Sequence, residues 1–254
     1  MSRKDTRKAN YGNWISNQLL YMPAATALFF LGLSVVSYLF IIAAGFFIII
    51  FAYFAYARFE FSPAGGDLQT KIHDLVLDHL KWDGEGKALD IGCGNAAFII
   101  KLAKKYPQAL VTGIDYWGGR WGYSKEACEK NAEIEGVADQ TDFRKASASS
   151  LPFEDNYLDA VVSNFVFHEV KDSRDKREVI KEALRVVKKG GVFAFQDLFL
   201  VKSTYGEVDD LLATIRSWDI RDVKFVNTST NSFIPRLLKL PFMVGSIGII
   251  YGTK

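Results

Sequence analysis

Cysteine is scarce in this sequence of 254 residues, and neither sign of charge dominates it. The two cysteines, Cys93 and Cys128, are too few for a disulfide framework, which indicates a reduced intracellular protein. The 31 lysines and arginines nearly balance the 29 aspartates and glutamates, so we expect no nucleic acid as a partner. The three histidines do not lie at metal-ligand spacing from the cysteines or from one another, so no metal site is expected.

Charge is missing altogether from one long stretch. Between Lys8 and Arg58 the chain has no Asp, Glu, Lys or Arg, and most residues there are apolar or small. One crossing of the hydrocarbon core takes about 20 residues, so this stretch suits two short helices better than one. We predict membrane spans near residues 19–37 and 40–58, with the reversal at residues 37–39. A single long, tilted helix is the alternative.

Basic residues precede this stretch, within residues 3–8. They favour a cytoplasmic N-terminus, and two crossings return the rest of the chain to the same side. The predicted organisation is a cytoplasmic segment 1–18, a transmembrane helical hairpin 19–58 and a cytoplasmic domain 59–254. We expect a multi-pass protein of the cell membrane with the lipid bilayer as a partner. Small residues in the spans allow a homo-oligomer through the transmembrane helices.

Beyond residue 66, short apolar runs alternate with segments of helical periodicity. Strands are expected at 87–91, 109–114, 141–146, 158–163 and 191–196, with two closing strands near 221–227 and 245–253. Helices are expected at 67–80, 97–106, 124–135, 175–187 and 206–216, with a turn at Gly190-Gly191. This alternation is typical of an α/β protein with a doubly wound, mostly parallel sheet, whose ligands bind beyond the carboxyl ends of the strands.

A glycine-rich turn follows the first of these strands, with the sequence LDIGCGNAA over residues 89–97. Gly92 and Gly94 allow the backbone to turn sharply and to approach a ligand closely. Taken alone, this pattern also fits a nicotinamide dinucleotide site or a structural turn. Asp90 favours a third interpretation, because a carboxylate repels a pyrophosphate and attracts a ligand with a sulfonium and an ammonium group.

The second strand ends at Asp115. A carboxylate at this point can accept hydrogen bonds from both hydroxyls of a ribose. Nicotinamide and adenosylmethionine sites share this feature, so it indicates a nucleoside without choosing between them.

Four segments, taken in order, resemble the motifs of class I S-adenosylmethionine-dependent methyltransferases, nearest in style to the quinone, sterol and small-molecule enzymes. They are LDIGCGNAAF, GID, SLPFEDNYLDAVVSNFVFHEV and KEALRVVKKGGVFAFQD. The resemblance covers roughly residues 67–200, and the C-terminal GIIYGTK resembles the family's last strand. It implies a Rossmann-like doubly wound sheet with an antiparallel last strand, here preceded by two transmembrane helices. The implied cofactor is S-adenosyl-L-methionine, which becomes S-adenosyl-L-homocysteine.

The resemblance also implies roles for single residues. The methionine part of the cofactor would lie against Asp90, Gly92, Cys93, Gly94 and Asn95, the ribose against Asp115, the adenine against Ser147 and Ala148, and the reacting methyl group against Asn164 and Phe165. The family often has Asp before that alanine. Here Ser147 stands in its place, so a hydroxyl and a backbone amide would contact the adenine.

The link after Asp115 is longer than is usual in the family and rich in aromatic residues. Tyr116 and Trp117 open it, and further aromatic residues follow up to Tyr123. This loop could wall the adenosine or clamp an acidic head group. The alternative is an aromatic surface loop, or one packed against the membrane spans.

Two residues are candidates for acid–base chemistry. His168 follows the fourth strand, and a histidine with a pKa near neutrality can take a proton from a hydroxyl or an acidic carbon. A histidine at a helix start can instead be a hydrogen-bonding cap. Asp197, at the end of the fifth strand, is the second candidate. An amine acceptor would need no base, since methyl transfer depends largely on positioning.

The membrane segment bears on the acceptor molecule. Anchoring holds an enzyme near molecules that do not leave the bilayer, and residues 233–243 add large apolar side chains with Arg236 and Lys239, which suit an interface. These residues could equally cover the sheet. We expect methylation of a lipid or isoprenoid-type hydrophobic small molecule at the cytoplasmic membrane surface. The alternatives are a methyltransferase of a membrane protein, a catalytically silent scaffold that keeps the fold, and a membrane-tethered nicotinamide-dependent reductase.

Overall fold

The computed structural model describes residues 8–118 and 122–254. The chain divides into two compact units. One is Gly12–Ile72, and the other combines the described residues up to Tyr11 with His73–Lys254. The first unit contains the apolar stretch, and the second contains the sheet.

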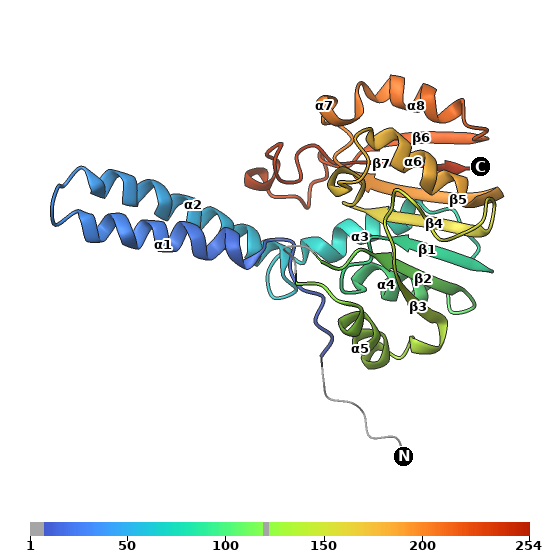
Figure 1. The fold of residues 1–254 in the computed structure, drawn as a ribbon, viewed down its shortest axis with the longest axis horizontal. Helices are drawn as coiled ribbons and strands as arrows, with labels where there is room; N and C mark the ends of the chain where they lie inside the picture. Colours follow the sequence, from blue (N-terminus) through green and yellow to red (C-terminus); the bar gives the residue numbers. More distant parts are fainter. Residues whose placement is uncertain (1–7, 119–121) are drawn as a thin grey trace, which may run out of the picture. The chain divides into compact units, whose positions relative to one another are not determined.

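The apolar stretch folds into two antiparallel helices, α1 (Asn17–Leu33) and α2 (Phe40–Phe61), which lie side by side (Figure 1). Aromatic rings hold the pair together, because the ring of Phe30 on α1 lies 5.9 Å from that of Phe40 and 5.8 Å from that of Phe47. The chain therefore reverses between the helices, and the alternative of a single long helix is wrong.

The first helix is shorter than predicted. It ends at Leu33, because the residues after it form turns in which the Ser34 hydroxyl donates to the Leu31 carbonyl at 2.6 Å. With 17 residues, α1 is about 25 Å long, whereas α2, with 22 residues, is about 33 Å long. The hydrocarbon core is about 30 Å thick. Among the described helices, α2 alone is long and apolar enough to cross it, so two helices of full span length are not found.

Large apolar side chains of the hairpin are exposed. On α2, Ile42 is 72% exposed, Ile49 is 70% exposed and Phe46 is 60% exposed. Contiguous apolar surface of this kind is unfavourable in water and marks a site of interaction with a membrane or another protein.

The second unit is built on a sheet of seven strands in the order β3-β2-β1-β4-β5-β7-β6 (Figure 1). The strands are β1 (Lys87–Ile91), β2 (Leu110–Asp115), β3 (Thr141–Lys145), β4 (Leu158–Asn164), β5 (Val187–Asp197), β6 (Asp222–Asn227) and β7 (Gly248–Thr253). Strands β1 to β5 are parallel, and β7 is antiparallel to both β5 and β6. The predicted doubly wound sheet with an antiparallel last strand is confirmed.

Helices cover both faces of this sheet. They are α3 (Leu68–His79), α4 (Ala97–Lys105), α5 (Lys125–Glu135), α6 (Lys176–Arg185), α7 (Lys202–Tyr205) and α8 (Val208–Arg216), with short 3-10 turns at Ala138–Gln140, Phe167–Glu169 and Arg236–Leu238. Side chains alternate along β1, so that Leu89 and Ile91 pack with α6 and α8 while Ala88 packs with α4 and α5. Both faces are thus buried, as a parallel sheet requires.

One local prediction is wrong. Gly190 and Gly191 do not form a turn ahead of the fifth strand, since β5 already begins at Val187 and runs through them. The pairing of β5 with β4 shifts between Leu158 and Ala160, which is the mark of a bulge. Gly190 has φ +82°, and a Cβ on Gly191 would lie 3.0 Å from two carbonyl oxygens, so the glycines allow the bulge.

Candidate functional site

The turn after β1 is fixed by backbone hydrogen bonds. The N–H groups of Gly92 and Cys93 both donate to the carbonyl of Ile114 on the neighbouring strand β2, at 2.7 and 2.9 Å. Gly92 has φ +77°, and an added Cβ would collide with the side chain of Val166. This position therefore requires glycine for its conformation and for its space. Sequence reasoning did not find Val166, because it comes from the loop after β4.

The next glycine of the turn connects it to the end of β2. Gly94, at φ +56°, donates its N–H to Asp115 at 2.9 Å, and its carbonyl accepts from the Trp117 indole at 2.9 Å. The N–H of Trp117 donates to the other Asp115 oxygen at 2.9 Å. The predicted residues of two different strand ends are thus brought together. Each Asp115 oxygen still has a lone pair for a further donor, which fits the two hydroxyls of a ribose.

Asp90 lies under this turn and is almost completely buried, at 1% exposure. Burial, followed by the charge of Asp115, raises its pKa to about 8, against a backbone hydrogen bond from Ile99. Its Oδ2 atom has no hydrogen-bond partner within the described residues. A buried carboxyl oxygen without a partner is costly, and a cationic donor placed against it would remove that cost. Asp90 therefore fits a ligand with an ammonium or sulfonium group.

The region after β3 contains an acidic residue that sequence reasoning missed. The hydroxyl of Ser147 donates to Asp172 at 2.7 Å, and so does that of Ser149. These hydrogen bonds hold the pKa of Asp172 below its usual value. Ala148 is buried beside Ser147. Because its proton is already used, Ser147 could contact a ligand as an acceptor, and Asp172 is the carboxylate exposed at this point. Asp172 follows β4, and its position gave no signal in the sequence.

Asn164 is the last residue of β4, and Phe165 follows it. The side-chain oxygen of Asn164 is buried and has no partner within the described residues, so it is a second polar atom suited to a ligand. Phe165 has φ +59°, and its N–H donates to the Gln196 carbonyl of β5 at 2.9 Å. Its ring lies edge-on to that of His168, at 6.4 Å.

The structure brings the two acid–base candidates into direct contact. Nδ1 of His168 lies 2.6 Å from Oδ1 of Asp197. Asp197 is fully buried, and it also accepts from the N–H groups of Phe167 at 2.8 Å and Leu198 at 2.6 Å. The histidine ring is therefore held by a fixed carboxylate through Nδ1, which places the second proton site at Nε2.

Two opposing effects act on the pKa of His168. Burial lowers it, whereas the charge of Asp197 and the hydrogen bond to it, together with the charge of Glu169, raise it. The net shift is upward. The side chain is 22% exposed, and Nε2 lies 3.7 Å from Glu169. A partly accessible histidine oriented by a buried carboxylate can act as a general base.

The aromatic loop after β2 divides into residues with different surroundings. Trp117 packs against the glycine turn, whereas Tyr116 is 68% exposed and lies under the ammonium group of Lys145. Tyr123, at the far end of the loop, packs at Gly94, where an added Cβ would lie 3.3 Å from its ring. Burial, then the charge of Asp115, raises the pKa of Tyr123 to about 12. Gly119, Arg120 and Trp121 lie outside the described residues.

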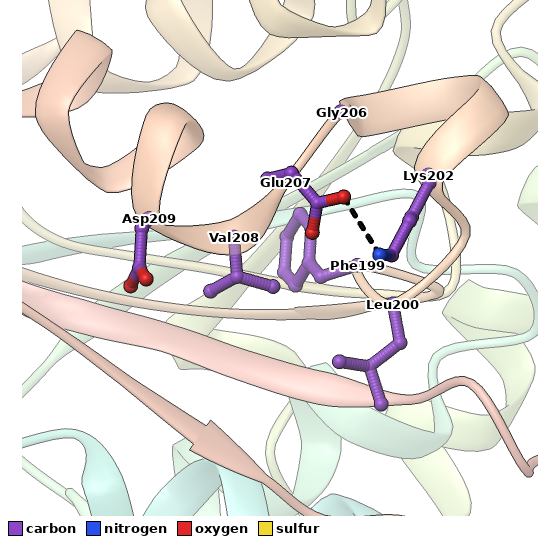
Figure 2. A pocket seen from close by; sticks show the side chains of 7 residues that line it. All are labelled: Phe199, Leu200, Lys202, Gly206, Glu207, Val208 and Asp209. Atoms are coloured by element: carbon purple, nitrogen blue, oxygen red, sulfur yellow. Dashed lines mark ion pairs between the residues drawn. The ribbon is translucent and has the colours of Figure 1, made fainter.

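A separate hollow of about 150 Å³ lies between the end of β5 and the start of α8 (Figure 2). Phe199, Leu200 and Val208 supply its apolar lining, and Lys202 forms an ion pair with Glu207 at 2.7 Å across it. It is smaller than usual ligand pockets, which measure about 300–1,000 Å³, and none of the predicted site residues lines it.

Within residues 8–118 and 122–254, no three His, Cys, Asp or Glu side chains are grouped as metal ligands. His73 belongs to the core, where its ring stacks on Phe98 at 4.9 Å. Burial, then the charge of Lys101, lowers the pKa of His73 to about 3, so this histidine is neutral.

Comparisons with known proteins agree with this geometry. The family described as "Methyltransferase domain" matches residues 89–195, which include the end of β1, the glycine turn and most of β5. A sterol 24-C-methyltransferase of Aspergillus fumigatus is 33% identical over 122 residues, which are 48% of this chain and 30% of that protein. A demethylmenaquinone methyltransferase of Bacillus cytotoxicus is 27% identical over 175 residues, which are 64% of this chain and 69% of that protein.

A solved structure shares the fold. The geranyl diphosphate C-methyltransferase of Streptomyces coelicolor A3(2), in complex with Mg²⁺, geranyl diphosphate and S-adenosyl-L-homocysteine, superposes with a TM-score of 0.56 at 16% identity. The match covers 74% of this chain and 79% of that chain. This chain spans less than half the length of three curated relatives that it matches. Over residues 89–195 the chain is therefore similar to methyltransferase domains, and the order of its strands agrees with that similarity.

Proposed function

We propose that the chain is an S-adenosylmethionine-dependent methyltransferase that acts at the cytoplasmic surface of a membrane. Its acceptor is a lipid or isoprenoid-type hydrophobic small molecule. The observation that carries the proposal is the pairing of Asp90, a buried carboxyl with a free oxygen, with Asp115, a carboxylate fixed at the same glycine turn.

The residues of the turn fit the cofactor. Oδ2 of Asp90 would take the ammonium group of the methionine part, and the carboxylate of Asp115 would accept from the ribose hydroxyls. Asn164 would line the reacting end with its unpaired side-chain oxygen. When bound, the cofactor supplies an electrophilic methyl group on a positively charged sulfur. The protein's part is to hold the acceptor atom in line with that carbon.

The pair of His168 and Asp197 supports an acceptor that must lose a proton. Asp197 orients the imidazole and stabilises its charged form, so Nε2 of His168 can take a proton from a hydroxyl or an acidic carbon as the new bond to the methyl group forms. The acceptor would form its bond to the methyl group as this proton leaves, and the electron pair of the broken methyl–sulfur bond would stay on the sulfur of S-adenosyl-L-homocysteine. A neutral amine already has a lone pair and would depend less on this arrangement.

Two features support a membrane-held acceptor. The first is the exposed apolar hairpin with α2 of span length. The second is the segment around Arg236–Leu238, where Leu237 is 61% exposed and Phe242 is 67% exposed while the arginine is also exposed. Such a mixture of apolar and basic side chains suits the boundary between lipid head groups and acyl chains. Neither feature has a clear use for an enzyme whose acceptor is dissolved in water.

The test is incubation of the purified full-length chain with methyl-labelled cofactor and total lipid extract, followed by mass analysis of the labelled product. We expect label in an extractable hydrophobic molecule. The variant Asp197→Asn, which keeps the cofactor turn, should transfer little label. Labelling of water-soluble acceptors with none of the lipids would contradict the membrane acceptor, and absence of any S-adenosyl-L-homocysteine formation would contradict the activity itself.

A further inference from the structure

One face of α5 carries four polar side chains at helical spacing. Ser124 caps the helix, and Cys128, Asn131 and Glu135 follow on the same side. This face contacts the glycine turn at its first part and the N-terminal segment at its last part.

The first part of this face holds the glycine turn at two carbonyl groups and one side chain. The Cys128 thiol donates to the Gly94 carbonyl at 3.1 Å, and the Asn131 amide donates to the Asn95 carbonyl at 2.9 Å. The N–H of Ser124 donates to the side-chain oxygen of Asn95 at 3.2 Å. Helix α5 therefore stabilises the glycine turn through these three hydrogen bonds.

The last part of this face holds the segment that precedes the hairpin. The side chain of Asn131 pairs with both backbone groups of Asn10, since it accepts from the N–H at 2.9 Å and donates to the carbonyl at 2.9 Å. One helical turn further on, Glu135 accepts from the hydroxyl of Tyr11 at 3.0 Å. Burial, then the hydrogen bond to Glu135 and its charge, raises the pKa of Tyr11, so the phenol keeps its proton and remains a donor.

Asn131 thus contacts both the glycine turn and the N-terminal segment. It is 3% exposed, and three of its hydrogen-bonding positions are used in these contacts. If Asn10 leaves, a buried amide loses two partners at once, which is costly and frees the amide to turn away from Asn95.

We infer that Asn131 is a positioning residue that couples docking of the N-terminal segment to binding of the cofactor. This inference rests on the proposed function, because it gives the turn its ligand. The segment around Asn10 acts as a strap: when it is docked, Asn131 holds the Asn95 carbonyl and the turn keeps its binding geometry. Coupling of this kind is reciprocal, so the bound cofactor must also stabilise the docked strap.

The experiment uses the full-length chain with S-adenosyl-L-homocysteine as the probe. Asn131→Ala should weaken its binding about tenfold and raise the cofactor KM by a similar factor, with kcat at saturation close to wild type. The matched control is Thr141→Val, which removes a hydrogen bond of 3.0 Å to the Val137 carbonyl and touches neither the turn nor the strap. This control should bind the probe as the wild type does.

Hydrogen–deuterium exchange provides a second measurement, made on the wild type and on Asn131→Ala. The probe should slow exchange in the peptide that contains Asn10 and Tyr11, and in Asn131→Ala this protection should disappear. Unchanged exchange at the strap of the wild type, with the probe bound, would overturn the coupling. So would equal affinity of Asn131→Ala and wild type. If the wild type itself binds no probe, the proposed function fails before the coupling is tested.

Discussion

The two halves of the site are built in different ways. The half around Asp90 and Asp115 is made from the ends of two adjacent strands and a turn whose shape is set by backbone hydrogen bonds. The half around His168 and Asp197 is made by two side chains from different segments, which meet because β4 pairs with β5. In the proposed function the first half binds the cofactor, with Oδ2 of Asp90 lacking a hydrogen-bond partner among the described residues, and the second half transfers a proton. Binding and proton transfer should therefore be separable by mutation.

The largest effect is expected from the second half. Asp197→Asn removes the charge that orients and stabilises protonated His168, so we expect kcat to fall roughly a thousandfold with cofactor affinity unchanged. Single-turnover rates and calorimetry with S-adenosyl-L-homocysteine would measure the two quantities. If His168 and Asp197 act as one unit, the double variant with His168→Ala should be little slower than either single variant. A large loss of affinity in Asp197→Asn would show that the halves are not separable.

The next largest effect is expected in the half around Asp90 and Asp115, where a substitution should lower cofactor affinity. Gly92→Ala places a Cβ against Val166 at a positive φ, so we expect cofactor affinity to fall roughly a hundredfold. Gly136→Ala is the matched control, because Gly136 has φ +71° with nothing within 4 Å of the added Cβ. Gly136→Ala has the same unfavourable positive φ but no steric clash, so the affinity of this variant for the cofactor should stay near that of the wild type. Equal losses in both variants would assign the effect to backbone strain in general.

Turnover should depend on pH through the protonation of His168. A base must be neutral to accept a proton, and the pKa of His168 is raised above its ordinary value of 6.5. At saturating cofactor, kcat should be constant above the raised pKa and fall about tenfold per pH unit below it. A flat profile between pH 5.5 and 8 would exclude His168 as the base.

Cofactor affinity should depend on pH through the ionisation of Asp90. Its increase with pH should be separate from the pH dependence of kcat, which reports on His168. Asp90, whose pKa is raised to about 8, is mostly protonated at neutral pH, and a cationic ligand binds its ionised form. Binding therefore releases a proton, and affinity should rise about tenfold between pH 6.5 and 8. Calorimetry in buffers of different ionisation heat would count that proton. In Asp90→Asn the affinity should be lower, and this rise should be absent.

The smallest effect is expected at the adenine side. Ser147→Ala removes one of two hydroxyls that donate to Asp172 and leaves Ser149 in place. We expect a change in cofactor KM of about threefold, because an exposed hydrogen bond contributes little net free energy. Asp172→Asn is the informative companion. If the carboxylate contacts the adenine, that variant should raise KM more than Ser147→Ala does, and an equal or smaller effect would contradict the contact.

Much of the fold could be predicted from local patterns. Lys87–Ile91 was predicted with the same bounds as β1, and the helix expected at 124–135 begins one residue later because Ser124 is its cap. One error arises from strand pairing and the other from a local turn. Gly190 reads as a turn by composition, yet it is a bulge, because β5 must keep pairing with β4 on either side of it. The first helix of the hairpin ends early because a serine turn takes up its last carbonyl groups.

The candidate site also has features that could be predicted from the sequence and features that could not. The proximity of Asp90 and Asp115 could be predicted from the sequence, since they lie at the carboxyl ends of neighbouring strands and parallel strands end at one edge of a sheet. His168 and Asp197 could be named as candidates, but their contact depends on the register of β4 with β5. No sequence pattern indicated a role for Val166, Asp172 or Asn131. Their roles arise from contacts between residues far apart in the sequence.

The sequence by itself determined the order of strands and helices, the apolar stretch and the residue types at the strand ends. These depend on periodicity, length and the conformational freedom of glycine, which act over a few neighbouring residues. Tertiary structure alone decided that His168 and Asp197 form a hydrogen bond, that Oδ2 of Asp90 has no partner among the described residues, and that one face of α5 supports the glycine turn. Hydrogen bonds and desolvation act across a few ångströms of space, and the distance along the chain does not set them.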